Sequence, residues 1–126
     1  MVKEVISTTN APGAIGPYSQ GIKYGNLLFV SGQTPLDSVT MKITEGDVQR
    51  QAVQCIENIK SILEAAGSSL DNVLKSTVFI KDMNDFGKVN EIYGQYFTRN
   101  QPARSCIEVA RLPMDVLVEI EVIAYI

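Results

Sequence analysis

The segment QPARSCIEVARLPMDVLVEIEV, residues 101–122, contains two runs of strand-forming residues with a short break at Leu112–Asp115. Arg104 opens the first run, and Glu119 and Glu121 stand inside the second. Because the break is short, the two runs are expected to pair as antiparallel strands, with the guanidinium and the carboxylates near one sheet surface. Charges in apolar strands need partners, so Arg104 either forms an internal ion pair with Glu119 or Glu121, or binds the carboxylate of a small ligand.

Strand and turn signals in the first third of the chain predict a hairpin. The segment GIKYGNLLFVSG, residues 21–32, predicts two strands joined at Gly25-Asn26, a dipeptide suited to a two-residue turn. A shorter strand is expected at Lys3–Ser7, ahead of a loop rich in Gly and Pro. Residues 34–43 are expected to form a loop with room for one short strand.

Residues 44–67, TEGDVQRQAVQCIENIKSILEAAG, form the clearest predicted helix. Thr44 is expected to cap its start, with Asp47 three residues later, and Gly67 is expected to end it. Cys55 lies on the apolar stripe of this helix and is therefore expected to pack in the core. The residues that recur at helical spacing are Val48, Ala52, Cys55, Ile56, Ile59, Leu63 and Ala66.

The remaining segments complete a single domain of residues 1–126. NVLKSTVFI predicts a strand, and NDFGKVNEIYGQYF predicts a second helix with an apolar face. The resulting order, ββ(β)αβαββ, indicates an α/β (α+β) fold in which two helices cover one face of a mixed six-stranded sheet. The expected apolar face of the second helix consists of Phe86, Val89, Tyr93 and Phe97.

The predicted strands are apolar on both sides. Leu27 and Phe29 point one way, while Leu28 and Val30 point the other. Two helices are unable to cover both faces of the sheet, and a second apolar face needs a partner. We therefore expect an oligomer whose subunits join through the open face of the sheet.

Composition excludes several classes of function. A hydrophobic content of 45% and a charged content of 20% are typical of a globular domain. No apolar run approaches about 18 residues, and the N-terminus has no secretory h-region, so no membrane span and a cytoplasmic location are expected. The net charge of -3, without a Lys/Arg cluster, argues against nucleic-acid binding.

The absence of histidine narrows the chemistry further. It excludes Ser-His-Asp and Cys-His nucleophile systems and His-ligated metals, so catalysis would rely on carboxylates, Arg, Tyr, backbone groups or water. Cys55 and Cys106 show no metal-type spacing and are expected to be reduced thiols.

Three separated motifs resemble those of the Rid family, also called the YjgF family. They are AIGPYSQG at Ala14–Gly21, FVSGQTP at Phe29–Pro35, and PARSCIEVARLP followed by VEIEV. The resemblance covers essentially the whole chain. It implies a chorismate-mutase-like fold assembled as a homotrimer, with active sites in the clefts between subunits.

The most similar subgroup implies hydrolysis of reactive 2-imino acids, such as 2-iminopropanoate and 2-iminobutanoate, to 2-keto acids and ammonia. Arg104 would clamp the substrate carboxylate, and Glu119 would position or deprotonate the attacking water with help from the backbone carbonyl of Cys106. A protonated imine is already a strong electrophile, so no metal or cofactor is expected. The implied site consists of Arg104, Glu119, Tyr18, Ser31, Gly32, Asn90 and Cys106.

The other implied site residues have simpler interpretations beside the functional ones. Tyr18 would shield the site and donate from its hydroxyl, or it is a surface packing residue. Ser31 and Asn90 would orient the substrate, or they form ordinary strand-end and helix hydrogen bonds. Gly32 would let the backbone approach the ligand closely. The sulfur of Cys106 is not expected to react, because a nucleophilic thiol needs a thiolate-stabilising neighbour.

Two other functions compete with imine hydrolysis. A non-catalytic sensor would bind a keto acid or related carboxylate in the same cleft, using Arg104 without water activation by Glu119. An endoribonuclease or translation inhibitor is disfavoured by the charge and by the absence of histidine. The family often has a Gly-bearing turn after GQTP, whereas this chain has LDSVTMKITEG, so the conformation of loop 37–43 and its effect on substrate preference stay open.

Overall fold

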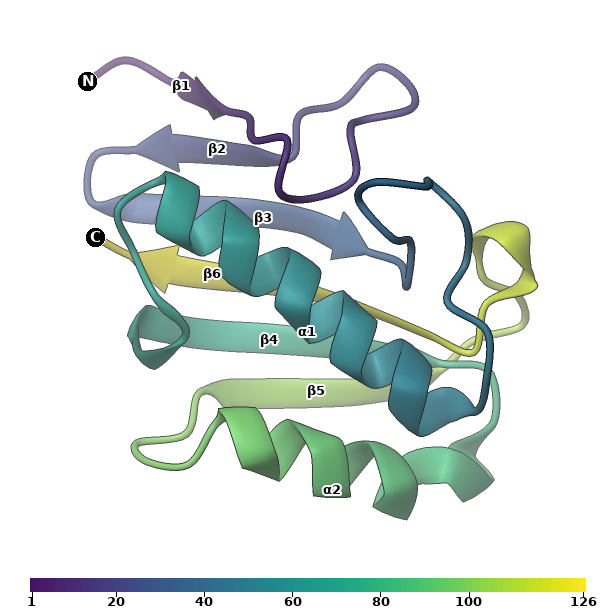
Figure 1. The fold of residues 1–126 in the computed structure, drawn as a ribbon. Coiled ribbons are helices and arrows are strands. Elements are labelled where there is room, and N and C mark those ends of the chain that lie inside the picture. Colours follow the sequence, from purple (N-terminus) through teal and green to yellow (C-terminus); the bar gives the residue numbers. More distant parts are fainter.

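The computed structural model describes residues 1–126, in which one mixed sheet carries both long helices on the same face (Figure 1). Single turns of 3-10 helix at Leu70–Asn72, Met83–Asp85 and Pro113–Asp115 join some of the elements. The element order and the two-helix cover agree with the order predicted from the sequence. The elements are β1 (Glu4–Ile6), β2 (Gly21–Tyr24), β3 (Leu27–Gln33), α1 (Val48–Ala65), β4 (Val73–Ile80), α2 (Phe86–Tyr96), β5 (Ala103–Glu108) and β6 (Val118–Tyr125).

The strand order in the sheet is β1-β2-β3-β6-β4-β5. β4 and β5 run parallel, and the other neighbouring strands are antiparallel. The expectation that the two C-terminal strands pair with each other was wrong, because β4 lies between β5 and β6. The helix α2 connects β4 to β5, and such a crossover places the two strands side by side in parallel. The final strand then fills the position between β3 and β4.

The predicted hairpin is present at the other end of the sheet. Tyr24 pairs with Leu27, so Gly25 and Asn26 form the two-residue turn. Gly25 has a φ of 61°, in the left-handed region that favours glycine in such turns. The loop at residues 34–43 carries a single bridge between Leu36 and Ile43 in place of a strand.

The helix α1 begins later than the sequence pattern suggested. Asp47, rather than Thr44, caps its start, and the Asp47 carboxylate accepts a hydrogen bond of 3.0 Å from the backbone N–H of Arg50. Thr44 lies outside the helix, where its hydroxyl is 3.3 Å from the side-chain oxygen of Gln54. Gly67, with a φ of 81°, follows the last turn and ends the helix as expected.

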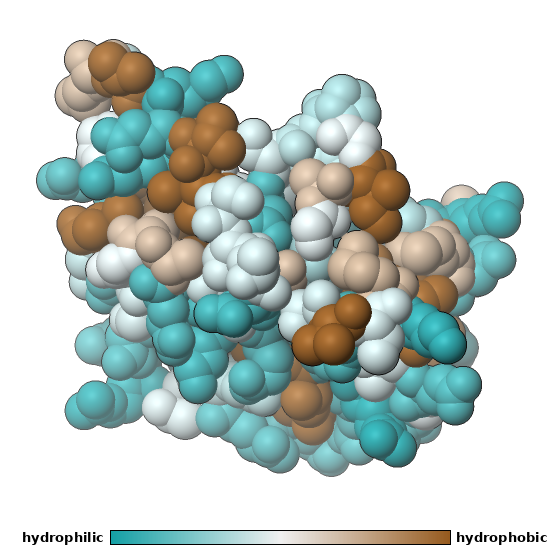
Figure 2. All heavy atoms as spheres, turned by 45° about the horizontal axis from the view of Figure 1, so that its top comes forward, coloured by the Kyte–Doolittle hydropathy of each residue, from teal (hydrophilic) through white to brown (hydrophobic).

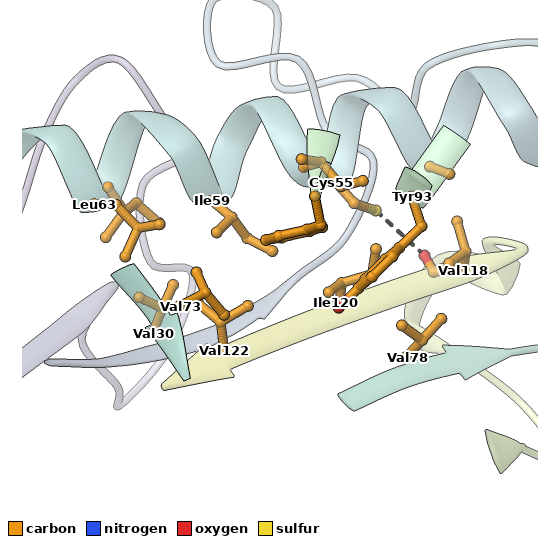
Figure 3. Close-up of a cluster of buried hydrophobic side chains, with 14 of the residues drawn as sticks. Val30, Cys55, Ile59, Leu63, Val73, Val78, Tyr93, Val118, Ile120 and Val122 are labelled. Atoms are coloured by element: carbon orange, nitrogen blue, oxygen red, sulfur yellow. Dashed lines mark hydrogen bonds between the residues drawn. The ribbon is translucent and has the colours of Figure 1, made fainter. Parts of the chain in front are cut away.

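The core lies between the helices and the sheet (Figure 3). The apolar stripe of α1 packs on alternate residues of the central strands, including Val30 and Ile120. Cys55 is fully buried, and its thiol donates to the carbonyl oxygen of Val118 across 3.6 Å, which confirms its core position. Of the expected apolar face of α2, only Phe86 reaches the surface, with 38% of its area exposed.

The opposite face of the sheet carries no helix, and the alternation of burial along the strands is clear. In β3, Leu28 and Val30 are buried while Leu27 and Phe29 are exposed, as predicted. Apolar residues also gather on another part of the surface, at the end where β1 begins (Figure 2). The exposed apolar side chains of the uncovered sheet face are Val5, Tyr24, Leu27, Phe29, Ile107 and Tyr125.

Candidate functional site

Arg104 lies on the helix-covered side of the sheet. It pairs in register with Ser76 of β4, and both side chains lie under α2. The guanidinium carbon is 4.7 Å from the centre of the Tyr93 ring and 5.5 Å from that of Phe86. No carboxylate of the chain lies within ion-pair distance of it, because the salt bridges of the chain involve only Lys88 with Asp85 and Arg111 with Asp115. The internal ion pair considered for Arg104 is therefore absent.

Arg104 and Asn90 line the same pocket, which has a volume of about 330 Å³. Asn90 lies on α2, which forms one wall, and the loop before β5 contributes Gln101 and Pro102 to the other wall. Cys106 follows Arg104 on the same side of the sheet, half-buried against the core. Burial raises the pKa of the Cys106 thiol, although the positive charge of Arg104 acts in the opposite direction. The pocket is lined by Asn90, Tyr93, Gly94, Gln101, Pro102 and Arg104.

Glu119 lies on the uncovered side of the sheet, opposite to Arg104. It pairs with Phe79 of β4, whereas its neighbour Ile120 points into the core. Its carboxylate lies directly over Gly32 of β3, in the volume that a Cβ at that position would occupy. Gly32 therefore makes room for the carboxylate of Glu119, in addition to any role in the approach of a ligand.

A second pocket, of about 450 Å³, surrounds this carboxylate. It brings Tyr18 and Gly32 together with Glu119, so three of the site residues expected from the sequence share one cavity. Most of the other lining residues are apolar. The pocket is lined by Ile15, Tyr18, Gly32, Thr34, Leu36, Pro113, Met114 and Glu119.

The pKa of Glu119 is raised, first by burial and then by repulsion from the neighbouring carboxylate of Glu121. A carboxylate with a raised pKa is a stronger base than an exposed one. A shift in this direction suits a group that takes a proton from water.

The loop that carries Tyr18 is anchored by hydrogen bonds from buried and partly buried side chains. The side-chain amide of Gln20 donates to the carbonyl oxygens of Thr8 and Pro12 at 3.0 and 2.8 Å, and its oxygen accepts from the N–H of Thr8 at 2.7 Å. The hydroxyl of Ser31 donates to the carbonyl oxygen of Ser19 at 2.6 Å. Ser31 thus ties β3 to the loop, so its contribution to the pocket is the placement of Tyr18.

Tyr18 itself is 53% exposed at the rim of this pocket. Its hydroxyl accepts a hydrogen bond of 3.3 Å from the backbone N–H of Ile15. Tyr18 therefore makes a hydrogen bond within its own Gly-Pro loop, and the other side of its ring is exposed to solvent. This position is compatible with shielding a ligand in the pocket.

The expected site residues fall into two groups on opposite faces of the sheet. Arg104, Asn90 and Cys106 belong to the helix-covered side, and Glu119 and Gly32 to the uncovered side. The ring contacts of Arg104 and the anchoring role of Gln20 were not predicted from the sequence. The ring contacts could have been anticipated from the spacing of Phe86 and Tyr93, which are two helical turns apart and so lie on one side of the helix. No group of three or more His, Cys, Asp or Glu residues is arranged to hold a metal ion.

These features define a subunit of the YjgF/L-PSP fold, an α+β sheet with helices on one face only. A family model described as endoribonuclease L-PSP matches residues 8–126, and the chain belongs to this family, the YjgF/Rid family. The resemblance inferred from the three motifs is confirmed. Neither helix is long and apolar enough to cross a membrane.

Relatives carry several names. A RutC family protein of Pyrococcus horikoshii is 60% identical over 124 residues, which cover 98% of each chain. A 2-iminobutanoate/2-iminopropanoate deaminase of Salmonella typhimurium is 52% identical over 126 residues, again covering 98% of each chain. The crystal structure of Escherichia coli TdcF with bound serine superimposes with a TM-score of 0.92 at 51% identity, and the match covers 98% of each chain.

Proposed function

We propose that this chain hydrolyses reactive 2-imino acids, such as 2-iminopropanoate and 2-iminobutanoate, to 2-keto acids and ammonia. The observation that carries the proposal is the guanidinium of Arg104, which lines a pocket without a carboxylate partner in its own chain. A planar guanidinium of this kind is suited to hold the carboxylate of a small acid through two parallel hydrogen bonds. The 52% identical deaminase of Salmonella typhimurium supports the choice of substrate.

A complete site would form between two subunits. Arg104 and Glu119 lie on opposite faces of one chain, so a small substrate bound to one is separated from the other by the sheet. Apolar residues such as Leu27 and Phe29 on the uncovered face favour association with further copies. In the proposed homotrimer, Arg104 of one subunit would meet Glu119 of the partner subunit in the cleft between them.

The proposed reaction needs little activation of the substrate. Arg104 would hold the carboxylate, and the protonated C=N bond would accept water at carbon. Glu119 would take the proton from the attacking water and return it to nitrogen, after which the carbinolamine would break down to a keto acid and ammonia. Positioning of water and imine would supply most of the rate increase.

The bound serine in TdcF is compatible with a site for small carboxylates. Serine carries a carboxylate and an amino group on one carbon, as the imino acid carries a carboxylate and an imine. We propose that the carboxylate position in this chain is set by Arg104. The imine end of the substrate would then face the pocket that holds Glu119 and Tyr18.

The direct test is ammonia release from an imine generated in situ by a threonine dehydratase or an amino-acid oxidase. The chain should accelerate release, and Arg104→Ala should not. A protein that binds 2-ketobutyrate through Arg104 and leaves ammonia release unchanged would instead be a carboxylate sensor. Cleavage of RNA by the same preparation, lost in Glu119→Gln, would favour the ribonuclease named in the family description.

A further inference from the structure

The side chain of Arg104 is held by two aromatic rings of α2. Tyr93 lies 4.7 Å and Phe86 5.5 Å from the guanidinium carbon, measured to the ring centres. The two residues are about two helical turns apart and so project from the same side of the helix. We infer that Phe86 and Tyr93 form an aromatic cradle that positions Arg104 to bind the carboxylate of its ligand, an inference that rests on the proposed function.

A buried hydrogen bond sets the orientation of the Tyr93 ring. The Tyr93 hydroxyl lies 2.6 Å from the hydroxyl of Ser76, which is fully buried on β4. Ser76 is also the register partner of Arg104 on β5. Tyr93 therefore contacts both members of this pair, Ser76 through its hydroxyl and Arg104 through its ring. Figure 3 shows the Tyr93 side chain pointing from α2 into the core above the sheet.

The Tyr93 ring is fixed on another side as well. Its centre lies 4.4 Å from that of Phe97, at an interplanar angle of 32°. A side chain held by a hydrogen bond, a ring contact and burial has little rotamer freedom left. The ring is thus a rigid support for a group that, on its own long side chain, would otherwise be mobile.

Ring contacts leave the hydrogen-bonding capacity of Arg104 unused. A guanidinium attracted to the electron-rich face of a ring keeps its N–H edges free for an anion. No carboxylate of the chain occupies those edges. Pre-ordering the side chain lowers the entropy lost when a carboxylate binds, so the cradle should strengthen binding without entering the chemistry.

The cradle residues should accordingly affect binding more than turnover. The carboxylate is held equally in the substrate and in the transition state, so weaker holding raises KM and the Kd for 2-ketobutyrate while kcat changes little. Loss of one partly buried cation–ring contact should weaken binding roughly 5- to 30-fold.

Four variants separate positioning from general stability. Tyr93→Leu and Phe86→Leu remove a ring, and Tyr93→Phe keeps the ring but loses the hydroxyl. Val89→Ala is the matched control, because Val89 is buried on the same helix but makes no ring contact with Arg104. At a temperature where all four are folded, both Leu variants should bind 2-ketobutyrate more weakly. Tyr93→Phe keeps the ring but loses the hydroxyl that orients it, so it should weaken binding less than Tyr93→Leu does. Val89→Ala should bind like the wild type despite its lower Tm.

A measurement without ligand completes the test. The Nε–Hε resonance of Arg104, assigned through its loss in Arg104→Ala, should carry a ring-current shift that moves toward the value of a free arginine in Tyr93→Leu. Unchanged resonance and unchanged affinity in both Leu variants would overturn the inference, as would equal weakening in Val89→Ala. If the wild type binds no keto acid, or binds it without Arg104, the proposed function fails and the carboxylate-binding role of the cradle fails with it.

Discussion

Arg104 and Glu119 lie on opposite faces of the sheet, although a single strand, β4, separates β5 from β6. Arg104 shares the side of Ser76, beneath α2, whereas Glu119 shares the uncovered side with Phe79. One chain therefore provides two incomplete halves of the proposed site. A substitution of Arg104 removes one half, and a substitution of Glu119 or of its neighbour Gly32 disturbs the other.

Arg104→Ala should abolish imine hydrolysis and 2-ketobutyrate binding together. The change in Tm should be modest, because within the chain Arg104 has no ion pair to lose and gives up only its contacts with the rings of Phe86 and Tyr93. Losing a partly buried bidentate contact costs about 2–5 kcal/mol, or roughly 30- to several-thousand-fold in kcat/KM. Arg104→Lys should recover only part of this, because an ammonium group lacks the planar fork. Ammonia release and thermal unfolding on one preparation test both points. A large fall in Tm with normal turnover per folded protein would contradict the proposed role.

Mixing two inactive variants should restore activity if the site is shared. Arg104→Ala retains Glu119, and Glu119→Gln retains Arg104, so an intact site forms where the right neighbours meet. After unfolding and refolding of an equimolar mixture, roughly a quarter of the sites should be intact, since each draws its two groups from independent chains. The variants refolded separately are the control. A mixture with no more activity than its components would place both groups in one chain.

The raised pKa of Glu119 predicts how stability changes with pH. The folded state holds the Glu119 proton more tightly than the unfolded state, so this contribution to stability is present below the usual pKa of glutamate and is lost as pH rises through the raised pKa. Glu119→Gln has no such loss. In the Arg104→Ala background, where no guanidinium of a neighbouring copy would stand beside the carboxylate, adding Glu119→Gln should therefore raise Tm relative to its parent by an amount that grows as the pH rises from about 4 toward neutral. Thermal unfolding across this range checks the sign, and a constant Tm difference would contradict it.

Gly32→Ala should inactivate the site by displacing the carboxylate of Glu119, because the added Cβ claims the volume that the carboxylate now fills. Turnover should fall toward that of Glu119→Gln, while binding of 2-ketobutyrate through Arg104 should change less. Gly87→Ala is a suitable control, since a Cβ there would meet nothing within 4 Å. Full activity in Gly32→Ala would show that the carboxylate can move without loss of function.

Cys106→Ala should leave turnover nearly unchanged. Burial raises the pKa of the Cys106 thiol, which keeps it protonated and poorly nucleophilic at neutral pH. Cys55 is buried in the core and equally remote from chemistry. Ammonia release before and after treatment with a thiol reagent gives a second readout. Loss of activity in a well-folded Cys106→Ala protein would restore a thiol mechanism.

Much of the fold was predictable because local signals and burial agree. The Gly25-Asn26 turn, the alternation along β3 and the apolar stripe of α1 each follow from residue type and spacing. The start of α1 was misplaced because Thr44 and Asp47 are both good capping residues. In the structure the backbone N–H of Arg50 donates to the Asp47 carboxylate, and the sequence alone does not show which of the two residues is the cap.

The candidate site was less predictable. The alternation of apolar and polar residues along a strand shows which face of the sheet each residue occupies, but it does not show which strands lie next to each other. The error at β5 and β6 came from judging by the short connection between them. A strand, a helix and a strand at residues 73–108 form a crossover unit that favours parallel neighbours, and this signal was available. The contacts of Gln20 and Tyr93 depend on tertiary packing, and no sequence pattern predicts them beyond the presence of suitable residue types.

The uncovered face of the sheet also affects whether the newly synthesised chain stays in solution or aggregates. A single folded copy presents the side chains of Phe29, Ile107 and Tyr125 to solvent, and in the proposed homotrimer they would stay exposed until another copy binds. Charged side chains on the same face, such as Glu121 beside Glu119, oppose non-specific aggregation through this surface. On this argument Glu121 protects the exposed face against aggregation, and Glu121→Ala should lower the yield of soluble protein.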